Sequence, residues 1–393
     1  MTHRSGRHFL QIPGPTNVPD RVLRAIDRPT IDHRGPAFRA LARGLLDDLP
    51  AIFGTEQPVV VYPSSGTGAW EAALVNTLSP GDRVLMYETG HFSTLWTRMA
   101  ERLGLFVDLL EGDWRSGVDP ARVEEHLAAD DAREIRAVAV VHNETSTGVT
   151  SDIAAVRQAI DRAGHPALLL VDTISSLASI DYRHDEWGVD VTVGGSQKGL
   201  MLPPGLGFNA VSERARAAAA TARLPRAYWD WEDVLRANED AVFPSTPATN
   251  LLYGLREAID MLLEEGLERV FARHQRHAAA TRLAVQTWGL EIQCRVPSEH
   301  SASLTGVAVG EGHDADTVRE VALERFDMSL GAGLGRLGGR MFRIGHLGDF
   351  NDLTLLGTLG GVEMSLGLAG IEPAGSGLQA ASEHLASTEV SAG

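Results

Sequence analysis

Residues 189–199 read VDVTVGGSQKG, an apolar run followed by a turn of small residues, and contain the only lysine of the chain, Lys198. Every other one of the 35 lysines and arginines is arginine, which supplies positive charge. Only a primary amine can lose its proton and attack a carbonyl group to form a Schiff base. The small neighbours let a ligand approach the backbone closely. This stretch predicts a ligand site at Lys198, with a lysine retained by chance as the alternative.

Short apolar runs of the same kind recur on both sides of this stretch. Several, such as the AVAVV of RAVAVV at 136–141 and the ALLLV of ALLLVD at 167–172, are continuous apolar runs rather than alternating ones. This pattern is typical of a largely parallel sheet that is covered by helices on both faces. Segments 67–78 and 152–163 have helical spacing. We therefore expect a three-layer α/β domain with strands at 58–62, 83–87, 105–110, 135–141, 167–171, 189–193 and 207–211.

The pattern changes near residue 255 and indicates a smaller α+β domain. We predict an N-terminal arm at 1–20, a large domain at 21–262 and a small domain at 263–393. From about residue 373 the chain is rich in Ala, Gly and Ser, so we expect a surface strap or partial disorder. The elements expected after about residue 255 are helices at 255–263, 267–288, 315–326 and 352–368, strands at 303–309 and 340–345, and a glycine-rich turn between 326 and 340.

The bulk composition narrows the class of protein. A net charge of −17 and a pI near 5.2 argue against a surface for nucleic acid or anionic membranes. The chain has no run of about 18 apolar residues that could span a membrane, and no apolar leader is visible at its start. Its single cysteine, Cys294, cannot form an intrachain disulfide, which fits a reducing compartment. We expect a cytoplasmic protein.

The segment PSSGTG at 63–68 follows a predicted strand and opens a predicted helix. Small residues let the backbone wrap an anion, while the hydroxyls of Ser65 and Thr67 and the free N–H groups of the helix start can donate hydrogen bonds. No Gly-Lys-Ser/Thr follows, so this is not a Walker A loop. The segment predicts a phosphate site, with an ordinary capped helix start as the alternative.

Asp172 ends the buried run ALLLVD, at the edge of the sheet where α/β proteins bind ligands. A buried carboxylate needs a partner. The pyridine nitrogen of pyridoxal phosphate is a natural one, because the carboxylate keeps the nitrogen protonated and the ring can then accept electrons. A structural aspartate at a turn is the alternative.

Two further segments carry polar residues at the expected ligand edge or in the small domain. HNETSTG at 142–148 follows the strand at 135–141, and its His-x-Glu spacing is similar to that of zinc deaminases. Those enzymes need paired cysteines, so no metal is expected.

Arg343 lies in an apolar strand, where burial favours an anionic partner; a substrate carboxylate or a protein acid would fit. GLGRLG at 333–338 matches a dinucleotide motif, but a strand follows it, so we discount that role.

These segments together resemble the class V aminotransferases, which are fold-type-I pyridoxal-phosphate enzymes, and most of all their serine–glyoxylate group. The resemblance implies a mainly parallel sheet sandwiched by helices, a smaller C-terminal α+β domain and an obligate dimer. The matching segments cover nearly the whole chain: PGPTN (13–17), SSGTGAWEAAL (64–74), TGHFSTLW (89–96), HNETSTGV (142–149), LLLVDTISS (168–176), DEWGVDVTVGGSQKGLMLPPGL (185–206), TPATNLLYGLREA (246–258) and FRIGHLG (342–348).

The resemblance implies pyridoxal 5'-phosphate as cofactor and a role for each matching residue. Lys198 looks like the Schiff-base lysine and Asp172 like the partner of the pyridine nitrogen. Phe92 would stack on the ring, where related alanine–glyoxylate enzymes carry a tryptophan, and Thr145 would contact the ring on its hydroxyl side. The residues that would hold the phosphate are Ser65, Gly66, Thr67, Gln197 and, from the neighbouring subunit, Thr246.

The substrate side is implied in the same way. Arg343 would bind the substrate carboxylate, with Asn17 nearby. Residues 242–246, VFPST, lack the tyrosine that relatives often place there, which weakens the prediction for the contact between subunits. The implied reaction is a ping-pong transfer of the amino group of L-serine to glyoxylate, giving hydroxypyruvate and glycine.

Other donors and other classes of protein stay open. Alanine or aspartate could replace serine as donor on the same scaffold, although a second carboxylate needs its own cation and only Arg34, beside His33, is a candidate. A hydroxyl needs only a polar partner, such as the turn at 16–17 or His346. Lyase chemistry is a further alternative. A desulfurase would need a mobile catalytic cysteine, whereas Cys294 lies outside every matching segment. A binding protein without catalysis would not need Lys198.

Overall fold

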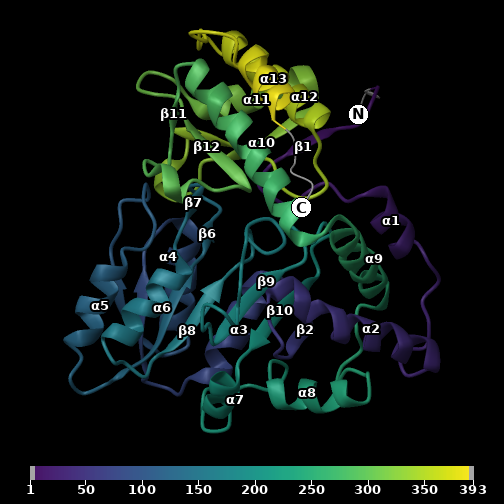
Figure 1. Ribbon diagram of the computed structural model, residues 1–393, viewed down its shortest axis with the longest axis vertical. Coiled ribbons are helices and arrows are strands. Elements are labelled where there is room, and N and C mark those ends of the chain that lie inside the picture. Colours follow the sequence, from purple (N-terminus) through teal and green to yellow (C-terminus); the bar gives the residue numbers. More distant parts are fainter. Residues whose placement is uncertain (1–4, 389–393) are drawn as a thin grey trace.

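The computed structural model describes residues 5–388, which fold around two separate sheets, and we call the parts built on them the large and the small domain (Figure 1). The larger lies below in the view and contains a seven-stranded sheet, while the smaller lies above around a five-stranded sheet. No helix within residues 5–388 is long and apolar enough to cross a membrane.

The large sheet has the strand order β2-β10-β9-β8-β5-β3-β4. Its strands run parallel except β10, which is antiparallel to both of its neighbours. All seven predicted strands are present. Their bounds are β2 Val59–Pro63, β3 Arg83–Tyr87, β4 Phe106–Leu110, β5 Ile135–Val141, β8 Leu168–Asp172, β9 Val191–Gly195 and β10 Leu206–Val211. A small pair, β6 Asn143–Glu144 and β7 Val149–Thr150, follows β5.

Successive residues of each central strand pack into different cores, which is why the apolar runs are continuous. In β5, Ala137 and Ala139 join one cluster, whereas Val138 and Val140 join another on the opposite face. Helices cover both faces and fulfil the expected three-layer arrangement. Their bounds are α1 Asp20–Ile26, α2 Pro36–Phe53, α3 Gly66–Thr77, α4 His91–Arg102, α5 Pro120–Ala128, α6 Ile153–Arg162, α7 Glu213–Ala219, α8 Trp231–Glu239 and α9 Thr249–Glu265.

The small domain has the strand order β1-β13-β14-β12-β11. Its first strand comes from the predicted N-terminal arm: Phe9 pairs with Met328 in a parallel ladder, so the arm begins inside this sheet. The glycine-rich segment after 326 contains a strand, β13, that was not expected. The bounds are β1 Phe9–Gln11, β11 Glu291–Ile292, β12 Leu304–Ala308, β13 Met328–Ala332, β14 Met341–Gly345, α10 Leu267–Thr287, α11 Ala315–Phe326, α12 Asp352–Leu368 and α13 Gly377–Ser387, with short turns of 3₁₀ helix at Pro297–Glu299 and Gly335–Leu337.

Residues 377–387 of the C-terminal segment are ordered, so of the two expectations, a surface strap or partial disorder, the second is contradicted for them. Residues Gly377–Ser387 form α13, which packs on α10. The Ser376 hydroxyl accepts a hydrogen bond from the backbone of Gln379 and caps this helix. Ala381 and Leu385, four residues apart, are buried in the small-domain core. The expectation of partial disorder was wrong because two well-spaced apolar residues anchor a segment that is otherwise small and polar; residues 389–393 lie outside the described part of the chain.

The motif GLGRLG at 333–338 joins β13 to β14 through the turn Gly335–Leu337. It opens no α-helix and lies in no β-α-β unit, so it lacks the structural context in which this motif binds a dinucleotide.

Candidate functional site

A cavity of about 220 Å³ opens where β8 and β9 end and α3 begins. It brings together residues from several matching segments that are distant in the sequence. The predicted residues that line it are Ser65, Gly66, Thr67, Phe92, Thr145, Asp172, Gln197 and Lys198. Gly14, Trp70 and Ile174 complete the lining.

Lys198 lines this cavity, and only 7% of the residue is exposed. Its Nζ atom donates a hydrogen bond to the carbonyl oxygen of Pro13, and the hydroxyl of Thr16 donates to the Lys198 carbonyl oxygen at 3.1 Å. Burial, followed by the nearby positive charge of Arg343, lowers the pKa of Lys198 from 10.5 to about 7. A large share of the amine is therefore neutral, and hence nucleophilic, near neutral pH.

Asp172 ends β8 with its carboxylate in the same cavity. One oxygen, Oδ2, accepts from the indole nitrogen of Trp70 at 3.0 Å, and the other, Oδ1, accepts from the backbone of Ile174 at 2.6 Å. Burial, with a smaller contribution from the charge of Glu144, raises the pKa of Asp172 from 3.8 to about 7. A cationic partner in the cavity would restore the charged form of this carboxyl group.

The start of α3 fits the phosphate group expected from the sequence. The helix begins at Gly66 after Ser65, whose side chain caps none of the backbone groups in the described chain. A Cβ atom at Gly66 would lie 2.2 Å from Cδ1 of Ile174, and one at Gly207 would lie 2.7 Å from the Ser65 carbonyl oxygen. Close packing thus holds a set of free helix N–H groups in place at the cavity wall.

Gln197 adds an unused polar atom to this wall. Its side-chain oxygen, Oε1, is buried without a hydrogen-bond partner in the described residues. A buried acceptor of this kind normally has a partner. A free helix start, a neutralisable amine and a buried carboxyl group make the cavity fit pyridoxal phosphate, whose ring hydroxyl could donate to the Gln197 oxygen.

Glu144 organises the rim of the cavity and was not singled out from the sequence. Its buried carboxylate accepts hydrogen bonds from the backbone of Phe92 at 3.3 Å and Ser93 at 3.1 Å, and from the hydroxyl of Ser146 at 2.6 Å. It therefore ties the 142–148 loop, which carries Thr145, to the first turn of α4, which carries Phe92. In the sequence this residue is marked only by the His-x-Glu pattern, whose spacing indicates a metal motif rather than a contact with α4.

Arg343, in β14 of the small domain, does not line the cavity itself but contacts Thr145, which does. Its Nη1 atom donates to the carbonyl oxygen of Thr145 at 2.7 Å, and its Nε atom donates to that of Ala332 at 2.8 Å. Burial lowers the pKa of Arg343 to about 10, which leaves the group charged at neutral pH. No acid of residues 5–388 forms an ion pair with it, so the alternative of a protein salt bridge is not what the structure has.

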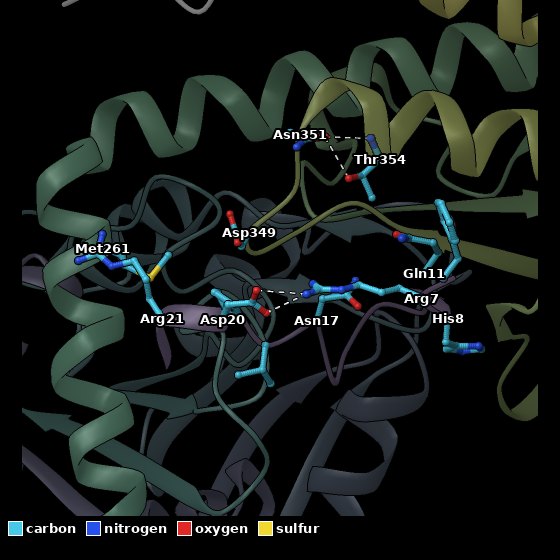
Figure 2. A pocket seen from close by; sticks show the side chains of 13 residues that line it. Arg7, His8, Gln11, Asn17, Asp20, Arg21, Met261, Asp349, Asn351 and Thr354 are labelled. Carbon is cyan, nitrogen blue, oxygen red and sulfur yellow. Dashed lines mark hydrogen bonds and ion pairs between the residues drawn. The ribbon is translucent and has the colours of Figure 1, made fainter. Parts of the chain in front are cut away.

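Two predicted residues lie elsewhere. Asn17 lines a separate pocket of about 490 Å³ beside α1, where Arg7 and Asp20 form an ion pair (Figure 2). The Asn17 amide nitrogen donates to the carbonyl oxygen of Leu10, so the side chain is used within the arm. Thr246 is exposed in the loop before α9 and does not line the cavity. The roles of both residues stay predictions.

Comparison with known proteins agrees with this geometry. The family model "Aminotransferase class-V" matches residues 8–333. The serine–glyoxylate aminotransferase of Methylorubrum extorquens is 51% identical over 391 residues, which cover 98% of this chain and 97% of that protein. The L-aspartate–glyoxylate aminotransferase of Paracoccus denitrificans is 48% identical, with 97% of each covered.

A solved structure shows the same architecture. The pyridoxamine–pyruvate aminotransferase of Mesorhizobium loti superposes with a TM-score of 0.91 at 28% identity, over 98% of this chain and 99% of that one. The strands, the cavity at their carboxyl ends and the sequence matches lead to one assignment: this chain belongs to the class V aminotransferases, a family of fold-type-I enzymes that depend on pyridoxal phosphate.

Proposed function

We propose that this chain is a pyridoxal-phosphate-dependent aminotransferase that moves the amino group of L-serine to glyoxylate. The observation that carries the proposal is the meeting of Lys198 and Asp172 in one cavity, with Arg343 arriving from the other domain. The similarity to a serine–glyoxylate aminotransferase over nearly the full length of both chains supports it.

The residues that would hold the cofactor surround the cavity. The start of α3, with Ser65, Gly66 and Thr67, would bind the phosphate, and Gln197 would add a polar contact. Asp172 would pair with the pyridine nitrogen, and Phe92 would cover one ring face. When bound, the cofactor supplies an electron-accepting ring that stabilises negative charge at the substrate α-carbon.

The chain's own residues would perform the remaining tasks. Arg343, whose Nε and Nη1 atoms donate to backbone carbonyls, would turn its remaining N–H groups toward the α-carboxylate of the amino acid and so orient it. Lys198, neutral in a large share of molecules near pH 7, removes the proton from the α-carbon and later returns one during the second half of the cycle. Burial of both groups keeps bulk water away from the proton transfer.

Serine is favoured over aspartate by the charges near the cavity. Lys198 is the only cation among the residues that line it, and Arg343 would already be used by the α-carboxylate. A second carboxylate would need another cation within this space. Arg34 is exposed and does not line the cavity in the described chain. A serine-specific and an aspartate-specific relative have similar sequence identity to this chain, so identity does not favour either donor. Our choice of serine over aspartate therefore rests on this charge argument.

We also propose a homodimer in which the exposed Thr246 reaches the phosphate bound by the partner subunit. Cofactor affinity would then depend on dimer formation. Sedimentation of the loaded enzyme is expected to show a dimer or larger assembly, and a fully active monomer would contradict this.

Cys294 is a free, buried thiol, which agrees with the cytoplasmic location that we propose.

A half-reaction tests the choice of substrate. The loaded enzyme is mixed separately with L-serine, L-alanine and L-aspartate, and loss of the visible band of the bound cofactor is followed. We expect serine to react with the highest kcat/KM. At least tenfold higher kcat/KM for alanine or aspartate would overturn the choice of donor but not the aminotransferase. Arg343→Lys is the matched control: it keeps the charge but lacks the fork, so KM should rise for every donor.

A further inference from the structure

The position of Arg343 relative to Lys198 depends on how the two domains are held together. Arg343 belongs to β14 of the small domain, while Lys198 follows β9 of the large domain. The Nε atom of Arg343 donates to the carbonyl oxygen of Ala332, the last residue of β13. The segment that begins after Ala332 therefore supports the guanidinium from the small-domain side.

Residues 333–339, which we call the latch loop, form this segment and contain the glycine-rich motif. A Cβ atom at Gly333 would lie 2.0 Å from the carbonyl oxygen of Leu337, so the loop is folded tightly on itself. At its tip, Arg336 reaches the large domain: its Cζ atom lies 4.3 Å from the centre of the Trp114 ring, and its Nη2 atom donates to the carbonyl oxygen of Gly112 at 3.3 Å. The cation thus stacks on an aromatic face of the other domain.

Trp114 is a rigid support for this contact. Its side chain is almost fully buried, and its indole nitrogen donates to the carboxylate of Glu88 at 2.9 Å. Its carbonyl oxygen accepts from the side-chain amide of Gln293 at 2.9 Å. The tryptophan is therefore fixed at both its side chain and its backbone.

The latch loop also touches the large domain beside the cavity. A Cβ atom at Gly335 would lie 3.1 Å from Cη2 of Trp114 and 3.2 Å from Nδ1 of His91. His91 is the first residue of α4, and the next residue, Phe92, lines the cavity. One end of the latch loop thus supports Arg343, and its tip rests next to the residue expected to cover the cofactor ring.

We propose that Arg336 is a positioning residue, which latches the small domain onto Trp114 and so holds Arg343 where the substrate carboxylate binds. This inference rests on the proposed role of Arg343. Arg336 itself does not line the cavity, so it acts through the placement of the domains. An exposed contact of this type typically changes an equilibrium about fivefold.

Loss of this contact would leave the fold intact. Other hydrogen bonds join the same large-domain loop to the small domain: Arg115 Nε to the Gln293 carbonyl oxygen at 3.0 Å, and the Gly117 backbone to the Glu299 carboxylate at 2.7 Å. They do not involve Arg336, which is exposed. The consequence should therefore appear in substrate binding rather than in folding.

The test compares Arg336→Met, Arg336→Lys and, as a matched control, Arg340→Met. Arg340 is an exposed arginine just beyond the latch loop, so its loss removes the same charge without touching Trp114. For Arg336→Met in the loaded enzyme, we expect KM for L-serine to rise about fivefold with kcat within about twofold. Arg336→Lys, which keeps a cation over the ring, should recover most of the affinity, and Arg340→Met should match the unmodified protein.

Hydrogen–deuterium exchange provides a readout that needs no substrate. Arg336→Met should speed exchange of the backbone amides in 112–118 and 333–339, while Arg340→Met should not. Unchanged exchange in Arg336→Met, or an equal rise of KM in Arg340→Met, would overturn the latch. If no amino acid is turned over but exchange changes as expected, the latch stands and the proposed function fails.

Discussion

The indole nitrogen of Trp70 lies 3.0 Å from Oδ2 of Asp172 and donates a hydrogen bond to it across the cavity wall. With the backbone of Ile174 bound to the other oxygen, both carboxylate oxygens have a fixed donor. The orientation of the carboxyl group is therefore set before any ligand arrives, which is the arrangement that electrostatic stabilisation of a bound cation requires.

Replacing Asp172 with Asn is expected to reduce kcat/KM by roughly 150-fold or more, which corresponds to about 3 kcal/mol of transition-state stabilisation. The reason is that the amide cannot hold the pyridine nitrogen in its protonated form. Steady-state kinetics with L-serine and glyoxylate measure the loss. Trp70→Phe, which removes one donor and leaves the carboxylate, should lose no more than about tenfold. A tenfold or smaller loss in Asp172→Asn would show that the carboxylate is structural.

Lys198→Arg should fold normally and lose transamination, because the positive charge remains and the nucleophile is gone. As Lys198 is the only lysine, borohydride treatment of the loaded protein should attach the cofactor to a single side chain in one peptide. Mass spectrometry of a digest identifies that peptide. Turnover comparable to the unmodified protein in Lys198→Arg would contradict the mechanism.

In the cofactor-free protein, the reactivity of the lysine side chain should change with a midpoint near pH 7 rather than 10.5. Below the midpoint the amine is protonated and inert, and above it the amine reacts with acetic anhydride. Pulsed acetylation across pH 5–11, with quantification of the peptide that contains Lys198, gives the curve. Removal of the Asp172 charge in Asp172→Asn should lower the midpoint further, since that charge raises the pKa of Lys198. A midpoint near the ordinary value would refute the effect of burial.

Gly14→Ala should weaken cofactor binding at least tenfold by displacing Lys198. Gly14 has a φ of +91°, and a Cβ atom there would lie 2.2 Å from Cδ of Lys198. Gly6→Ala is the control, because Gly6 has the same φ but no atom within 4 Å of its Cβ position. Titration of the cofactor-free variants with pyridoxal phosphate measures both affinities. Equal affinity in the two variants would show that the collision with Lys198 does not weaken binding, because the variants differ only in that contact.

The sequence was sufficient for the large domain because each central strand is apolar on both faces and ends in a polar segment. Asp172, Thr145 and Lys198 follow three such strands, and parallel strands bring their ends to one edge. The pairing of β1 with β13 could not be read in this way, since two short strands far apart in the chain carry no local signal of their contact.

The hydrogen bonds between polar groups of the site could not be predicted from the sequence either. Trp70 and Glu144 lay within matching segments, but neither periodicity nor spacing indicates which buried group accepts which hydrogen bond. The contact of Arg336 with Trp114 joins two loops of different domains and depends on the assembled fold. Such contacts follow from three-dimensional placement, which local patterns do not encode.

The parallel pairing of Phe9 with Met328 has a consequence for synthesis of the protein on the ribosome. The partner of β1, the strand that contains Phe9, emerges only after about 320 further residues have been made, so β1 must wait unpaired while they are synthesised. Pro13, whose carbonyl oxygen accepts a hydrogen bond from the Lys198 amine, lies in that same arm. A nascent chain that stops before β13 therefore lacks the partner strand of β1, which belongs to the same arm that supplies Gly14 to the cavity lining.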